Sequence, residues 1–184
     1  MVQIVVKSAK NGRRSRNARN GALFVRAARY SEDGEFRAAF QLFLRSARNG
    51  DSGSQLNVGF CYDTGEGVRR NKTKALFWYK RAYRRGDACA ANNTGTIWRD
   101  RQNPKRALYW FHRAIKLGNE DSNLEIAKLY LQNGDPSQAL TYLERITPSS
   151  IVTEATFEEA QHLLKLTRHS LQGSRKDRTI ADQK

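Results

Sequence analysis

Apolar side chains recur at spacings of three and four residues between positions 74 and 85. They are Ala75, Leu76, Trp78, Tyr79, Ala82 and Tyr83. This period places them on one face of a helix, with the basic residues of the segment mostly outside that face. A second helical segment precedes them, and Gly65 and Gly67 lie between the two. Glycine disfavours the helix interior and readily adopts positive φ, so the pattern predicts two helices joined by a glycine-rich turn.

The same pattern recurs along the chain, with steps of 36, 32 and 32 residues between equivalent positions. Four alanines follow these steps, as do the aromatic or leucine pairs that come three residues later: Ala39, Ala75, Ala107 and Ala139; Leu42-Phe43, Trp78-Tyr79, Trp110-Phe111 and Tyr142-Leu143. Independent residue classes share one register, and periods of this size indicate stacked supersecondary units. The sequence therefore predicts an all-α fold, an α-solenoid of about four antiparallel helix hairpins plus a C-terminal capping helix.

Helix-start signals place the hairpins. Asp51, Asn71 or Thr73, Asn103 before Pro104, and Asp135 before Pro136 are typical N-terminal caps. After a break at 147–150, a final helix is expected over Phe157–Leu171, where it would cover the apolar side of the last repeat. The predicted organisation is a flexible basic arm at 1–20, a repeat solenoid at 21–146, a capping helix at 147–171 and a disordered tail at 172–184.

One stretch resembles a known family. The pattern comprises Val58-Gly59 with Tyr62, Gly65-x-Gly67-Val68, and Lys74-Ala75-x-x-Trp78-Tyr79-x-x-Ala82-x-x-x-Gly86. It resembles the Sel1-like repeat, a relative of the tetratricopeptide repeat. The resemblance covers roughly Gly21–Ile146. The hairpins at 23–47 and 123–146 have the shorter spacing of tetratricopeptide repeats. The resemblance implies a helical solenoid that binds other proteins.

Charge is unevenly distributed. The chain has 33 Lys+Arg and 18 Asp+Glu residues, a net charge of +15. Residues 1–118 hold 25 basic and 8 acidic side chains, whereas residues 119–184 hold 8 and 10. The arm at 1–20 has six basic residues and no acidic one. It either attracts phosphates or an acidic protein, or it is simply a solvated tail.

Candidate chemistry is sparse. Of the three histidines, His162 and His169 are seven apart on one helix without a third ligand, so no metal site is predicted. Cys61 and Cys89 are interpreted as reduced thiols. Gly65-Glu66-Gly67 lacks the preceding strand and following lysine of a phosphate loop. Most repeat aromatics, Tyr109 among them, are interpreted as packing residues. The chain is therefore predicted to be no enzyme and to need no cofactor.

The resemblance implies that the first helix of each hairpin lines a concave face. Residues just outside the core stripe of those helices form the predicted partner-binding set: Asn57, Phe60, Asp63, Asn93, Thr96, Arg99, Glu125 and Lys128. Asn57 and Asn93 hold the same repeat position, where an amide can both donate to and accept from the backbone of an extended peptide.

The leading hypothesis is a non-enzymatic adaptor that binds a protein or peptide segment in this groove. The alternative is a nucleic-acid-binding or acidic-partner-binding protein that acts through its basic N-terminal half, including the outer helices. The apolar run Val2–Val6 is too short for a signal-peptide core, and no segment approaches membrane-crossing length. A cytoplasmic protein without membrane insertion is expected, although many Sel1-like proteins are exported, so a mature form stripped of its signal remains open.

Overall fold

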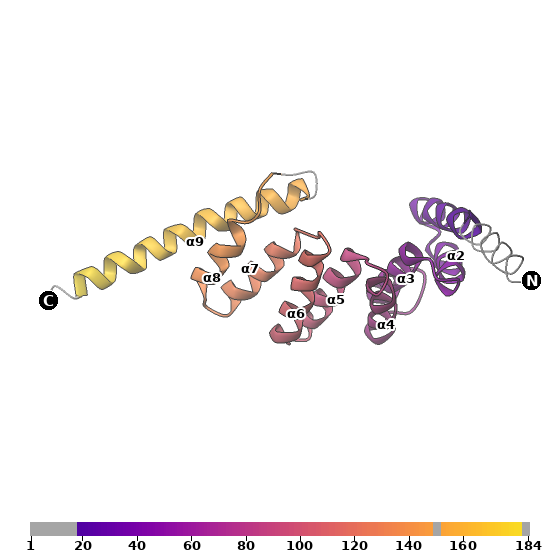
Figure 1. Ribbon diagram of the computed structural model, residues 1–184, viewed down its shortest axis with the longest axis horizontal. Helices are drawn as coiled ribbons and strands as arrows, with labels where there is room; N and C mark the ends of the chain where they lie inside the picture. The colour runs from indigo at the N-terminus through magenta and orange to yellow at the C-terminus, as the bar shows by residue number, and fades with distance from the viewer. Residues whose placement is uncertain (1–17, 149–151, 182–184) are drawn as a thin grey trace, which may run out of the picture. The chain divides into compact units, whose positions relative to one another are not determined.

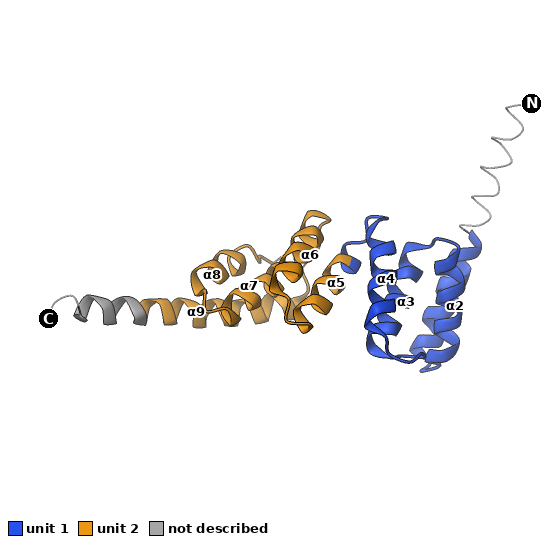
Figure 2. Cartoon of the chain, turned by 90° about the horizontal axis from the view of Figure 1, so that it is seen from below, with its two compact units in different colours: residues 1–90 blue, residues 91–184 orange. Residues whose placement is uncertain are grey.

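A computed structural model describes residues 18–148 and 152–181, with side chains through Gln172. The described residues form helices and turns and contain no strand, as the repeat pattern predicts for a helical solenoid (Figure 1). The chain divides into two compact units, residues 1–90 and residues 91–184 (Figure 2).

Unit 1 stacks helices around a core that repeats the alternation of small and large residues. It comprises a helix over residues 18–32, followed by α2 (Phe36–Arg48), α3 (Ser52–Thr64) and α4 (Lys72–Tyr83). α3 packs against both α2 and α4. The buried residues of its core are Ala27, Ala39, Phe40, Phe43, Ala47, Val58, Cys61 and Trp78. Burial of Trp78, which is 9% exposed, confirms the register derived from the sequence.

The glycine-rich turn is formed as predicted. Gly65 ends α3 in the left-handed conformation with φ 96°, and Gly67 has φ 68°. A Cβ on Gly67 would lie 2.1 Å from the carbonyl oxygen of Phe36, so this turn presses its backbone against the start of α2. Asn71, rather than Thr73, then caps α4 by accepting bonds from the backbone N–H groups of Thr73 and Lys74.

Unit 2 is likewise built of helices. Its helices are α5 (Ala88–Asp100, whose first three residues fall in unit 1), α6 (Pro104–Lys116), α7 (Ser122–Gln132), α8 (Pro136–Leu143) and α9 (Glu154–Ala181). Asn103 and Asp135 cap α6 and α8 through their side chains, each directly before a proline, as predicted. α7 packs against α6 and α8, and α9 packs against α8.

The final helix lies on the apolar side of the last repeat. Ala160 and Thr167 are buried, and Phe157, Leu163 and Leu164 pack against the unit 2 core. Leu166, by contrast, is 53% exposed.

Both expected boundaries of the ordered region differ from the structure. α9 continues ten residues past Leu171 to Ala181, so the helix enters the segment predicted to be disordered. No proline interrupts residues 172–181, and a low apolar content alone does not end a helix. At the other end, the first helix already includes residues 18–20. Asn20 is buried, because its backbone carbonyl accepts from Ser46 and its side chain accepts from Asn49. Residues 1–17 of the predicted arm and 182–184 of the predicted tail lie outside the described residues.

Candidate partner-binding face

The predicted binding residues lie on the first helix of successive hairpins. In unit 1, Asn57, Phe60 and Asp63 lie on α3 at intervals of three residues. They flank the buried positions Val58 and Gly59 and remain at least partly exposed. Phe60 is the most open of the three, with 41% of its surface exposed. Thus an apolar ring and two polar groups share one side of α3.

The polar groups of α3 are partly committed within the protein. The Asn57 side-chain N–H donates to the carbonyl oxygen of Gly53 at 2.9 Å, so its amide oxygen is left to accept a bond from a ligand. The amide nitrogen carries a second N–H, so the expectation that this amide both donates to and accepts from a peptide backbone stays a prediction. Asp63 forms an ion pair with Lys72 and accepts from the Tyr79 hydroxyl at 3.5 Å. Asp63 thus links the two helices of its hairpin.

In unit 2, the equivalent residues Asn93, Thr96 and Arg99 lie on α5, 36 positions further along the chain. The Thr96 hydroxyl donates to the carbonyl oxygen of Asn92 on its own helix at 3.3 Å. Arg99 crosses to α7 and forms an ion pair with Glu125. It also contacts Asp100 at 3.2 Å.

The charged members of the predicted set in unit 2 form one network across three helices. Glu125 on α7 pairs with Arg99 of α5 and lies 3.6 Å from Lys128. Lys128 reaches Glu159 on α9 at 2.8 Å. These side chains are between 19% and 49% exposed, so each pair is screened by water and contributes little to stability. An incoming charged group can therefore exchange with these partners at low cost.

Two elements of this face could not be found from spacing. Glu159 joins the network because the capping helix packs beside the last repeat, a contact that the repeat period does not specify. Asn92 accepts a 2.8 Å hydrogen bond from Ser122, which is fully buried and also contacts Asn119 at 2.6 Å. This polar contact joins α5 to the start of α7.

The second helices carry exposed aromatic rings, one of which, Tyr109, had been assigned to packing. Tyr109 on α6 is 52% exposed, which corrects its interpretation as a packing residue, and Phe77 on α4 is 53% exposed. Trp78 and Tyr79 are buried as expected, whereas Trp98 is half-buried. Helical position decides the difference, because Tyr109 and Phe77 lie just outside the inward stripe of their helices.

The titratable groups of the described residues form no group of three or more that could hold a metal ion. Burial, and secondarily the nearby charge of Glu66, raises the pKa of the Cys61 thiol to about 11. Burial, followed by the positive charges of Arg145 and Lys116, lowers the pKa of His112. A thiol with a raised pKa is a poor nucleophile at neutral pH, so Cys61 acts as a packing residue. In the part of the chain that the structure describes, no helix is long and apolar enough to span a membrane.

Comparison with known proteins agrees with this architecture. The Sel1 repeat family matches residues 33–51, 52–87 and 91–119. The structure of a Sel1 repeat protein from Oxalobacter formigenes is 26% identical, with a TM-score of 0.58 over 67% of this chain and 54% of that one. The chain thus contains three Sel1 repeats.

Two further similarities extend this result. The protective antigen c5321 from uropathogenic Escherichia coli, which displays an SLR fold, is 21% identical with a TM-score of 0.69 over 83% of this chain and 34% of that chain. "DAP3-binding cell death enhancer 1" from Rattus norvegicus is 30% identical over 96 residues, or 52% of this chain. The chain spans 18% of the length of that relative.

The Sel1 repeat family generally mediates protein–protein interaction, and Sel1-like repeat proteins are typically non-enzymatic scaffolds.

Proposed function

We propose that this protein is a non-enzymatic adaptor that binds an extended segment of a partner protein on the first-helix faces of its repeats. The main support is that partly exposed side chains recur at equivalent repeat positions. They are Asn57 and Phe60 on α3 and Asn93 and Thr96 on α5. Such repetition suits an extended ligand, because a peptide also presents its groups at regular intervals.

Phe60 is the apolar anchor of the proposed face. An aromatic ring with 41% of its surface exposed gains when a partner covers it, and such rings dominate binding energy at interfaces. One turn away, the free oxygen of the Asn57 amide can accept a backbone N–H of the partner. Together they support recognition of an extended peptide with an apolar side chain near position 60.

The ion-pair network in unit 2 supports selection among charged partners. A partner carboxylate can replace Glu125 at Arg99, and a partner ammonium or guanidinium group can replace Lys128 at Glu159. Because each existing pair is weak in water, exchange costs little, while a wrongly signed group meets repulsion. A protein partner is also in keeping with the name of the rat relative, which describes binding to another protein.

Photo-crosslinking tests this proposal. A benzoylphenylalanine residue replaces Phe60 in one variant and Leu117 in a control variant. The two native side chains are equally exposed, at 41% each. We expect a protein partner that crosslinks from position 60 and not from 117. Phe60→Ala should then weaken capture of that partner at least tenfold, whereas Leu117→Ala leaves capture unchanged. Equal capture by Phe60→Ala and the unsubstituted chain would exclude this face as the binding surface.

A further inference from the structure

The outward face of α6 combines positive charge with an exposed aromatic ring. α6 buries Ala107, Phe111 and Ala114 and contains no acidic residue. Its other side carries Lys105, Arg106, Tyr109, His112, Arg113 and Lys116. We call this set the α6 outer face. It lies on the second helix of its hairpin and is separate from the first-helix residues proposed to bind a protein.

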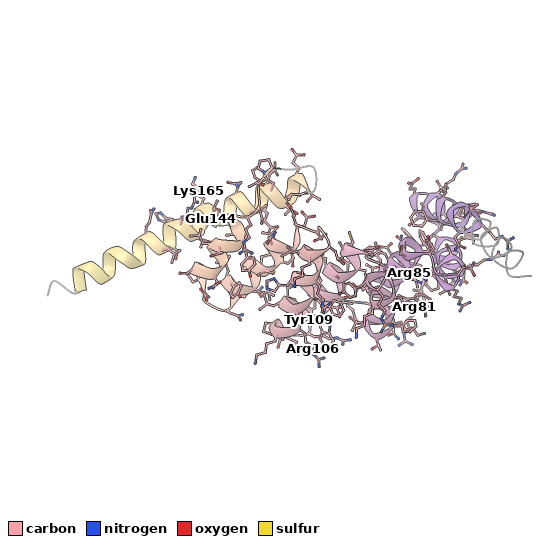
Figure 3. All side chains as sticks on the ribbon, viewed as in Figure 1. Arg81, Arg85, Arg106, Tyr109, Glu144 and Lys165 are labelled. Carbon is pink, nitrogen blue, oxygen red and sulfur yellow. The ribbon has the colours of Figure 1, made fainter. Side chains whose placement is uncertain are left out.

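The aromatic rings at this surface are stacked with guanidinium groups. The Arg113 guanidinium carbon lies 4.5 Å from the centroid of the Tyr109 ring. The Trp98 ring of α5 is contacted by Arg106 at 4.4 Å and by Arg101 at 5.2 Å. Figure 3 shows Arg106 and Tyr109 together on α6. Such flat, positively charged stacks present both a π-face and phosphate-binding groups.

The same pair occurs one repeat earlier, in unit 1. Phe77 and Arg81 precede Tyr109 and Arg113 by 32 residues each, which is the repeat step. Phe77 is 53% exposed, and the Arg81 guanidinium carbon lies 5.6 Å from its ring centroid. α4, like α6, contains no acidic residue. An exposed ring four residues before an arginine therefore recurs on the second helices of two consecutive repeats.

We propose that these aromatic–arginine surfaces, and the α6 outer face above all, bind single-stranded nucleic acid. Bases would stack on the Tyr109 ring and its arginine, while the neighbouring arginines and lysines contact phosphates. Proteins that bind single strands combine these two elements, an electropositive surface and aromatic stacking platforms. An acidic peptide could neutralise the same charge, but its carboxylates have no π-face and gain nothing from Tyr109. The exposed ring thus favours a nucleic acid over an acidic protein.

The decisive measurement separates stacking from charge. Fluorescence anisotropy follows a labelled twelve-nucleotide uridine RNA on the full chain between 50 and 200 mM salt. Tyr109→Ala should weaken binding about tenfold without altering the salt dependence, whereas Tyr109→Phe should bind as the unsubstituted chain does. Arg106→Ala should weaken binding and reduce the slope of log K against log salt by about 0.7, the value for one phosphate contact on a single strand.

Control substitutions come from the acidic half of unit 2. Lys165→Ala removes one cation, and Leu166→Ala removes an exposed apolar side chain as open as Tyr109. Lys165 lies on α9, at the opposite edge of unit 2 from Tyr109 in the view of Figure 3. Neither control should change RNA affinity. Since binding through the basic residues 1–17 would be insensitive to position 109, the tyrosine variant reports on the α6 outer face alone.

Two competitors define the ligand class. A deoxyuridine DNA of equal length differs from the RNA only in lacking the 2′-hydroxyl groups, and binding of either strand supports the proposal. A twelve-residue polyglutamate carries similar charge without bases and should compete poorly. Unchanged RNA affinity for Tyr109→Ala overturns the proposal. Competition by polyglutamate as strong as by RNA also overturns it and identifies a surface for acidic proteins.

Discussion

Close packing between paired helices makes Gly95 on α5 a sensitive position. A Cβ at this residue would lie 2.6 Å from both Cδ1 and Cε1 of Phe111 and 3.1 Å from its Cγ. Phe111 is fully buried. Rotation of the ring about the Cβ–Cγ bond leaves the 3.1 Å contact with Cγ in place, because Cγ lies on the rotation axis. The two helices would have to move apart to admit even one methyl group.

The size of the effect follows from two opposing contributions. Overpacking a buried site costs typically about 1–3 kcal/mol. Replacing glycine by alanine within a helix gains about 1 kcal/mol in propensity. Because the contacts fall about 0.8 Å short of ordinary van der Waals separation, we take the upper part of the overpacking range. Gly95→Ala should therefore lower the free energy of unfolding by about 1–2 kcal/mol.

The chain suggests the compensating substitution. Gly59 stands against Tyr79 and Gly95 against Phe111, each with a Cβ-to-ring distance near 2.5 Å. One repeat later, the equivalent pair is Ala127 and Leu143, both fully buried in the unit 2 core. A smaller partner thus accompanies the added methyl group. Phe111→Leu should accordingly relieve Gly95→Ala.

Urea denaturation followed by far-UV circular dichroism measures this double-mutant cycle. Phe111→Leu alone should lower the free energy of unfolding by about 1 kcal/mol as a large-to-small change. The double variant should lose less than the sum of the two single losses, with a coupling energy of at least about 1 kcal/mol. Gly21→Ala is the matched control, since nothing lies within 4 Å of its Cβ position. It should stabilise by up to about 1 kcal/mol. An unchanged Gly95→Ala variant, or additivity within about 0.5 kcal/mol, would refute the packing argument.

Three further outcomes are expected. Trp78→Ala should destabilise by about 3–5 kcal/mol in the same denaturation assay, because the ring is 9% exposed, and a loss below about 1 kcal/mol would contradict its place in the core. Deleting residues 153–184 should expose the apolar surface that α9 covers around Ala160, and light scattering should then show association. Deleting residues 174–184 should cause no association. If the protein without residues 153–184 stays monomeric and equally stable, α9 is not a cap. Burial raises the pKa of Cys61 to about 11, so iodoacetamide at pH 8 should label exposed Cys89 and spare Cys61 until the chain unfolds. Its folded-state pKa lies above that of the unfolded thiol, so its contribution to stability is present below about pH 9 and is lost as the pH rises towards 11; rapid labelling of both thiols in the folded protein would contradict the burial.

The repeat register was available from sequence because each hairpin buries its residues locally. Ala75, Trp78 and Ala82 face the core of unit 1 since their spacing matches the helical period. The caps Asn71 and Asn103 were equally readable, because a cap bonds to backbone groups only two or three residues away. Local chemistry thus determined where helices begin, where they turn and which stripe faces inward.

The binding face was only partly predictable. Spacing located the first-helix positions, and the structure brings Arg99, Glu125 and Lys128 together through the packing of α5, α7 and α9. Glu159 was missed because no periodicity relates α9 to the repeats. Asn20, expected in a flexible arm, is ordered by bonds to Ser46 and Asn49, residues more than two dozen positions away.

Sequence alone therefore determined the α-helical repeat, its caps and its inward faces, all of which depend on residues within a few turns of one another. Tertiary packing decided which borderline side chains stay in water, as Tyr109 on α6 and Leu166 on α9 show. Both are apolar residues next to an inward stripe, and their exposure depends on whether a neighbouring helix reaches them. That reach is set by contacts between elements distant in the chain, which the helical period cannot encode.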